Sequence, residues 1–257
     1  KELERTSDMR VHAFIIHFLA GVARDQEQLQ RLARAAIDDM LDPDLPEKQR
    51  SQLRYGLLRL GSPAIEVACE RLNAASERRS AELVRLLDVV CTEGDVSDGQ
   101  IDRAVQALLG ALEVSERTTR RRIVESSVIA DSRADSQLQE RVASELLSHM
   151  TEFRMQSTIE TMCQTLEQIG PPAMAPLLRY VQRRYPKEDT GEPFKSLGRI
   201  ARKYGSDLPE DIVRESLEFC MGLFEGRRSK KGNFAVALAY LAGHTPTGAE
   251  RYEEALE

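Results

Sequence analysis

Cysteine and histidine are the residues of this chain best suited to nucleophilic or metal chemistry, and there are four of each. The closest two cysteines, Cys69 and Cys91, are 22 residues apart, so no Cys-x-x-Cys metal or redox motif exists. His12 and His17 are five residues apart, which does not stack them on one helical face for chelation. Every cysteine lies in a helical apolar pattern, where a thiol behaves as a small buried hydrophobe. We therefore expect no metal site, no cofactor and no cysteine nucleophile.

Other catalytic signatures are also missing from the sequence. It contains no Gly-x-Gly-x-x-Gly, no Walker loop, no nucleophile elbow and no His-Glu-x-x-His. The 42 acidic residues are dispersed along the chain in a pattern typical of solvent-exposed helix faces, and no acid–base pair can be singled out among them. The sequence therefore predicts a protein that is not an enzyme.

Charged clusters are the most distinctive polar feature of the chain. Residues 1–116 hold 15 basic and 21 acidic side chains, whereas residues 117–257 hold 21 of each. The candidate binding residues are basic. Nine of them fall near expected repeat junctions, namely Arg120, Arg121, Arg122, Arg183, Arg184, Arg227, Arg228, Lys230 and Lys231, and the tenth, Arg179, is expected on an exposed helical face. An acidic patch is expected at the first junction, formed by Asp38, Asp39, Asp42 and Asp44. Such basic clusters suit an acidic partner or a phosphate backbone, although arginines near helix C-termini also complement the helix dipole.

The elements that position these clusters follow from a repeat. Turn signals recur near residues 25, 61, 94, 131, 170, 205 and 243, with spacings of 33 to 39 residues. Two of the turns lie in similar segments, 57–65 and 166–174, which align Gly61 with Gly170. A period of this size is typical of an array of helical pairs.

Helix signals flank each turn. Ser97 with Gln100, and Asp207 with Glu210, have the spacing of a capping box at a helix N-terminus. Apolar residues then recur at helical spacing, as at 101, 105, 108 and 112. Aromatic residues are only 5% of the chain and Trp is absent, which favours helices over sheets. We expect an all-α fold of seven antiparallel pairs that stack into a single solenoid domain over residues 1–257.

The Leu-x-x-Leu-Gly-x-Pro-Ala pattern of residues 57–64, with its counterpart at 166–173, resembles HEAT repeats of the armadillo-type α-solenoid family. This resemblance implies a right-handed α-α superhelix of about seven helical pairs, with the second helices lining a concave face. It also implies protein–protein binding and assigns no catalytic residue. On that face the sequence predicts a mixed-charge groove of Arg34, Glu66, Glu70, Arg103, Glu140, Arg179 and Arg214.

The leading functional prediction is a non-catalytic scaffold that binds a protein or peptide partner. The partner would bind to this concave face or to the charged edge formed by the acidic and basic clusters at the repeat junctions. Nucleic-acid binding along the basic junctions is the alternative, as in HEAT-like DNA alkylpurine glycosylases, although the net charge of −6 and the missing Trp depart from them. A HEAT-like lyase of the phycobilin-attaching type is a third class. We further expect a cytoplasmic location, no membrane partner, and a chain that is part of a longer protein.

Overall fold

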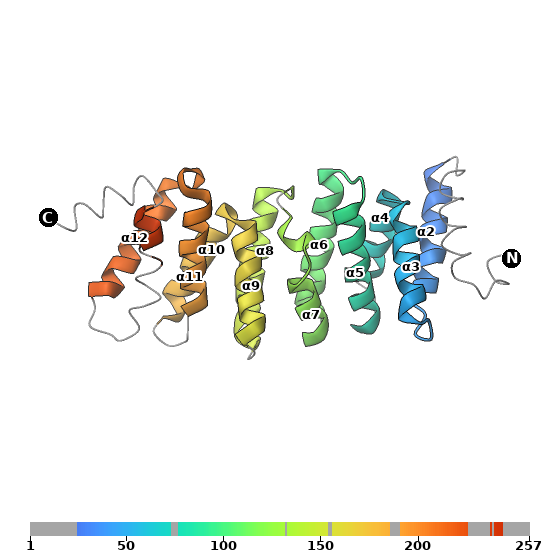
Figure 1. The fold of residues 1–257 in the computed structure, drawn as a ribbon, viewed down its shortest axis with the longest axis horizontal. Helices are drawn as coiled ribbons and strands as arrows, with labels where there is room; N and C mark the ends of the chain where they lie inside the picture. Colours follow the sequence, from blue (N-terminus) through green and yellow to red (C-terminus); the bar gives the residue numbers. More distant parts are fainter. Residues whose placement is uncertain are drawn as a thin grey trace. The chain divides into compact units, whose positions relative to one another are not determined.

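The structure is a computed structural model that describes residues 25–72, 77–131, 133–153, 156–185, 191–225, 237 and 239–243. Every regular element in this part of the chain is a helix, which confirms the predicted all-α class (Figure 1). The chain divides into two compact units, residues 1–134 and residues 135–257, and each is described by itself.

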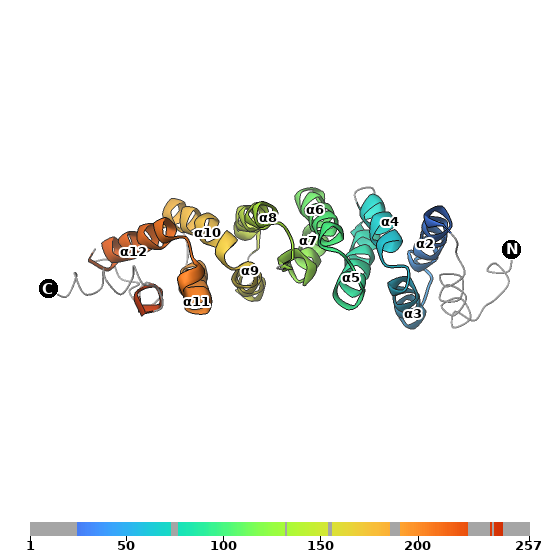
Figure 2. The same ribbon diagram turned by 90° about the horizontal axis from the view of Figure 1, so that it is seen from above.

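The first unit is built from two layers of helices. Its elements in chain order are α2 (Gln26–Met40), α3 (Glu47–Leu58), α4 (Ser62–Leu72), α5 (Glu77–Glu93), α6 (Asp98–Val114), α7 (Arg117–Val124) and the 3-10 helix η2 (Val128–Ala130). Helix α4 packs against α2 and α6, and α5 packs against α3 and α7. Figure 2 shows α2, α4 and α6 in one layer and α3, α5 and α7 in the other. Successive helices therefore alternate between the layers.

The second unit repeats this arrangement. Its elements are α8 (Ser136–His149), η3 (Met150–Glu152), α9 (Gln156–Ile169), α10 (Pro171–Arg184), α11 (Gly191–Tyr204), η4 (Gly205–Asp207) and α12 (Glu210–Glu225). Helix α10 packs against α8 and α12, and α9 packs against α11. Residues 239–243 contact α11, because the guanidinium of Arg202 lies over the ring of Tyr240, 5.5 Å from its centroid.

The turns predicted at residues 61, 94, 131, 170 and 205 coincide with breaks between helices, whereas those at 25 and 243 lie at the edge of the described residues. Asp25 is the N-cap of α2, and its carboxylate accepts a hydrogen bond from the backbone of the first turn. Gly61, Gly170 and Gly205 all have positive φ, at 56°, 78° and 49°, where a side chain is disfavoured. At Gly170 a Cβ atom would also lie 2.5 Å from the ring of Tyr204. The glycines that mark the repeat in the sequence are therefore required by the turn geometry.

One of the two predicted capping boxes is confirmed. Ser97 and Gln100 form the reciprocal pair at the start of α6. The box at Asp207 is wrong, because residues 205–207 form a 3-10 helix and α12 begins at Glu210. Leu208 is extended, as expected before the proline at 209, so the α-helix cannot begin earlier.

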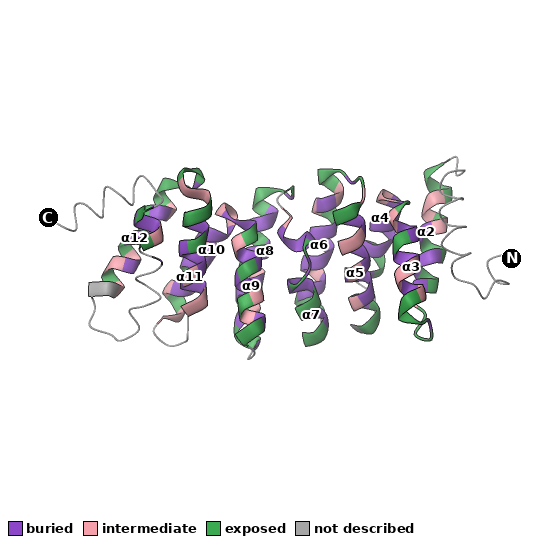
Figure 3. Ribbon diagram, viewed as in Figure 1, coloured by how far each residue is buried: buried purple, intermediate pink, exposed green. Residues whose placement is uncertain are grey.

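The core of each unit lies between its two layers (Figure 3). The apolar stripe predicted at residues 101, 105, 108 and 112 is fully buried, and the four cysteines are buried as expected. Among the described helices, none combines the length and hydrophobicity that crossing a membrane requires.

Candidate functional site

Arg120 lies in helix α7, whereas the sequence placed it in a junction between repeats. Its guanidinium donates hydrogen bonds to the carbonyl oxygens of Leu112 and Glu113, at 3.0 and 3.2 Å, and so caps the end of α6. Arg50 does the same at the end of α2, where it donates to the carbonyl oxygen of Met40 at 3.0 Å. Both arginines satisfy helix C-terminal carbonyls that would otherwise lack donors. They hold successive repeats together.

The neighbouring basic candidates also have a partner, at the C-terminal end of α7. Arg121 and Arg122 lie 2.7 and 3.5 Å from the carboxylate of Glu125, which follows the helix. The four candidates Arg227, Arg228, Lys230 and Lys231 lie outside the described residues.

The acidic patch lies at the C-terminal end of α2 and in the loop that follows. Asp38 pairs with Arg71 of α4 at 2.9 Å, and Asp39 occupies the last turn of α2 beside it. The carboxylate of Asp42 accepts a hydrogen bond from the backbone N–H of Asp44 at 2.9 Å. The structure thus brings a basic side chain from the next repeat into the predicted acidic surface.

The side chains predicted to form a mixed-charge groove in the first unit pair with one another between neighbouring helices of one layer, and we call this row of pairs the ladder. Arg34 of α2 lies 3.2 Å from Glu70 of α4. Gln30 donates to Glu66 at 2.6 Å, and Arg103 of α6 lies 3.6 Å from the same carboxylate. The partners are 36 or 37 residues apart, which is one repeat.

The second unit carries the same kind of ladder. Arg179 of α10 lies 3.1 Å from Glu140 of α8, and Gln182 donates to Glu215 of α12 at 2.9 Å. Arg214 pairs within its own helix with Glu210, at 2.8 Å. The groove charges therefore pair with one another. Arg179 and Glu140 are each about half exposed, so this pair contributes little stability.

A buried ionic cluster between α3 and α5 was not predicted. The guanidinium of Arg54 lies 2.7 Å from Glu82 and 2.6 Å from Glu47, and Arg85 lies 2.8 Å from Glu82. Arg54 and Glu82 are almost fully buried. The hydrogen bond from Arg54 lowers the pKa of the Glu47 carboxyl. No local sequence signal identifies this cluster, because Arg54 looks like a surface residue of α3 and its partner Glu82 lies 28 residues away in α5.

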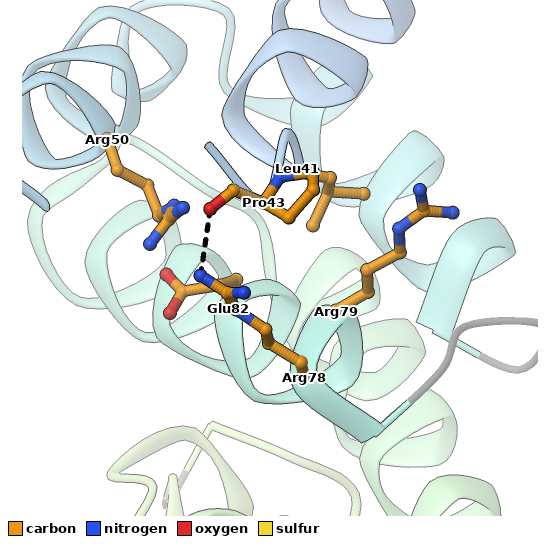
Figure 4. A pocket seen from close by; sticks show the side chains of 6 residues that line it. All are labelled: Leu41, Pro43, Arg50, Arg78, Arg79 and Glu82. Atoms are coloured by element: carbon orange, nitrogen blue, oxygen red, sulfur yellow. Dashed lines mark hydrogen bonds between the residues drawn. The ribbon is translucent and has the colours of Figure 1, made fainter. Parts of the chain in front are cut away.

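A pocket of about 230 Å³ opens beside this cluster, lined by Leu41, Pro43, Arg50, Arg78, Arg79 and Glu82. Figure 4 shows the guanidinium of Arg78 directed at the carbonyl oxygen of Pro43, to which it donates at 2.9 Å. Arg79 points away from Glu82 in the same view. Arg78 therefore joins α5 to the loop after α2, and Arg50 of α3 donates to the carbonyl oxygens of Asp42 and Leu45 in the same loop.

A second pocket, of about 290 Å³, lies between α8 and α10. It is lined by Ser144, Leu147, Ser148, Pro176, Arg179, Tyr180, Arg183 and Arg184, and so contains three of the predicted binding residues. Arg184 lies over the ring of Tyr180, 6.0 Å from its centroid. Arg183 is exposed and has neither an ion pair nor a hydrogen bond within the described residues. An apolar floor with an arginine rim is the arrangement best suited to ligand binding in either unit.

The described residues offer little catalytic chemistry. Burial raises the pKa of each of the four cysteine thiols to about 12, so the reactive thiolate form is suppressed. No group of His, Cys, Asp and Glu side chains in the described ranges could hold a metal ion. His149 pairs with Glu152 at 2.9 Å, whereas His12, His17 and His244 lie outside those ranges.

No family model, no curated protein and no solved structure matches this chain. The fold and the arginine-lined pocket are therefore the features that indicate a function.

Proposed function

We propose that the chain is a HEAT-like α-solenoid scaffold that binds a protein partner and carries no catalytic centre. The observation that supports this most is the alternation of helices between two layers within each unit. In the first unit α4 packs against α2 and α6, and in the second unit α10 packs against α8 and α12. Side-chain ladders one repeat apart join α2 to α4 and α8 to α10. Stacked helical repeats of this kind present extended surfaces suited to macromolecular partners.

The proposal includes the right-handed superhelix of about seven helical pairs, with α2, α4, α6, α8, α10 and α12 as the second helices that face the partner. It also includes a cytoplasmic location. The four buried cysteines support a reducing compartment, because none of them forms a disulfide.

Charge-swapped ladder pairs test the scaffold directly. The double variant R34E/E70R retains an ion pair between α2 and α4 but reverses the charge pattern that a partner meets. R179E/E140R does the same between α8 and α10. Affinity capture from extract, followed by cross-linking, measures which proteins bind to each variant. We expect at least one swap to weaken capture of a specific partner by about tenfold, equivalent to about 1.4 kcal/mol.

The matched control is E27R, because Glu27 is exposed in the first turn of α2 and pairs only within that helix, with Arg31. Equal capture by the wild type, both swaps and this control would mean that no partner reads the ladder surface. Helicity at 222 nm shows whether each swap preserves the fold.

Nucleic-acid binding is the second candidate, and the arginines of the α8–α10 pocket are the observation that favours it. A backbone binder loses affinity steeply with salt, because each neutralised phosphate releases counterions. A mobility-shift titration from about 50 mM salt upward measures this slope for duplex and single-stranded probes. Absence of binding at the lowest salt removes the candidate.

A further inference from the structure

We infer that the pocket between α8 and α10 binds a short acidic segment of a protein partner, one that carries an apolar side chain between glutamate or aspartate residues. This inference rests on the proposed scaffold function and deepens it by naming the site and the ligand chemistry. The pocket and the surrounding arginines carry the argument.

The floor of the pocket is apolar. Leu147 is 3% exposed, and Pro176 is buried beside it on the facing helix. Tyr180 adds an aromatic ring to the same wall. A volume of about 290 Å³ lies at the lower end of ligand-binding pockets, which fits a side chain better than a whole cofactor.

The ladder register explains why Arg183 lacks a partner. The pair of Arg179 with Glu140 aligns positions that are 39 residues apart on α10 and α8. One helical turn further on, Arg183 therefore meets Ser144. The hydroxyl of Ser144 donates to the carbonyl oxygen of Glu140 at 2.9 Å, so it offers no charge to the arginine. In the first unit the corresponding position, one helical turn after the pair of Gln30 with Glu66, is occupied by the ion pair of Arg34 with Glu70.

An exposed guanidinium without an ionic partner beside an apolar floor is suited to a carboxylate from another chain. Arginine binds carboxylates through two parallel hydrogen bonds, which gives orientation as well as affinity. Arg179 is 52% exposed and its partner Glu140 is 48% exposed, so a ligand carboxylate can also compete for this arginine. Arg184, over the ring of Tyr180, adds a third positive charge to the rim.

The same features favour a peptide over a nucleic acid. A phosphate backbone requires a row of unpaired cations along the surface. Along the described part of α8 and α10, the ladder pairs Arg179 with Glu140, so the arginines of the rim do not form such a row. An apolar side chain flanked by carboxylates complements both the floor and the rim.

The test uses the full chain and two fluorescein-labelled peptides, Gly-Glu-Glu-Leu-Glu-Glu-Gly and its glutamine counterpart Gly-Gln-Gln-Leu-Gln-Gln-Gly. Fluorescence anisotropy at about 50 mM salt measures affinity. We expect the glutamate peptide to bind at least about tenfold more tightly than the glutamine peptide, and R183E to remove that difference. The matched control is R141E, because Arg141 is an exposed arginine of α8 that does not line the pocket. Its affinity should stay close to that of the wild type.

Absence of binding by the glutamate peptide overturns the inference, as does equal loss in R183E and R141E. A short DNA duplex that binds more tightly than the peptide, and loses affinity in R183E, assigns the pocket to nucleic acid instead. Circular dichroism confirms that both variants fold. If R183E leaves peptide binding unchanged while the charge swaps still weaken partner capture, the pocket assignment fails and the scaffold function stands.

Discussion

Removal of the Glu82 carboxylate tests the buried ion pair between α3 and α5. In the Glu82→Gln variant the side chain keeps its size, but Arg54 loses the charge that lies 2.7 Å from its guanidinium. The side chains of Arg54 and Glu82 are only 9% and 11% exposed. Glu47, the remaining partner of Arg54, is 59% exposed and so compensates only in part.

The size of the effect follows from burial. Two unit charges about 4 Å apart attract by about 4 kcal/mol at an effective dielectric constant of about 20. Removing one member of a buried pair costs about 3–5 kcal/mol, because the other charge remains desolvated. Since Glu47 stays in place, we expect Glu82→Gln to lower the free energy of unfolding by about 3 kcal/mol.

Urea denaturation followed by circular dichroism at 222 nm measures this change by linear extrapolation. The matched control is Glu70→Gln, which removes the same charge from an ion pair whose side chains are 50% and 51% exposed. That variant should lose less than about 1 kcal/mol. The double variant R54M/E82L should be more stable than Glu82→Gln alone, because it leaves no charge buried.

Salt provides a second comparison. About 1 M NaCl screens exposed charges over distances of about 3 Å, so it should remove the effect of Glu70→Gln but leave most of the effect of Glu82→Gln. Equal losses in the two variants, or equal sensitivity to salt, would refute the assignment of a buried network between α3 and α5.

Three further predictions concern other parts of the fold. Gly170→Ala should lower stability by about 1–3 kcal/mol, because φ is +78° and the new Cβ would lie 2.5 Å from the ring of Tyr204. Gly99→Ala should not lower stability, because the Cβ at this position meets nothing within 4 Å. Thermal unfolding compares the two variants. Burial raises the pKa of the four thiols from 9.0 to about 12. A thiol-specific disulfide reagent should therefore react at least about a thousandfold more slowly with the folded chain than with the chain in urea. Rapid reaction of the folded chain would contradict the burial of the cysteines. Burial also raises the pKa of Asp88, so the stability that the protonated Asp88 contributes is present below the ordinary pKa of 3.8 and is lost as the pH rises through the raised value. Urea titrations across this pH range should show this loss of stability in the wild type and not in the Asp88→Asn variant. Parallel curves of stability against pH for the two proteins would contradict the prediction.

The helical boundaries could be predicted from the sequence because they depend on local backbone physics. Glycine is required where φ is positive, and it stands at residues 61, 170 and 205, each between two helices. The apolar stripe that begins at Ile101 is buried as its spacing predicts. The Asp207 box failed because a cap pattern competes with the conformation that Pro209 imposes on Leu208.

The partners of the charged residues could not be predicted from local patterns. Arg120 looks like part of a solvated basic run, but it caps the preceding helix α6. Arg54 looks like a surface residue of an amphipathic helix, but its partner Glu82 comes from α5, 28 residues away. Both contacts depend on how consecutive helices are stacked, which residue spacing within one helix does not encode.

The charge that a surface of stacked repeats offers to a partner is best counted after neighbouring repeats are aligned and the ion pairs between them are removed from the count. Residues that cluster along the chain, such as Arg121 and Arg122, pair with a carboxylate of their own segment. Residues one repeat apart, such as Arg34 and Glu70, pair across the layer and neutralise each other. Arg183 is left for a partner because the position opposite it is filled by a neutral residue, Ser144. In the described part of this chain, the number of arginines is therefore a weaker guide to binding than an interruption of the ladder such as the one at Arg183.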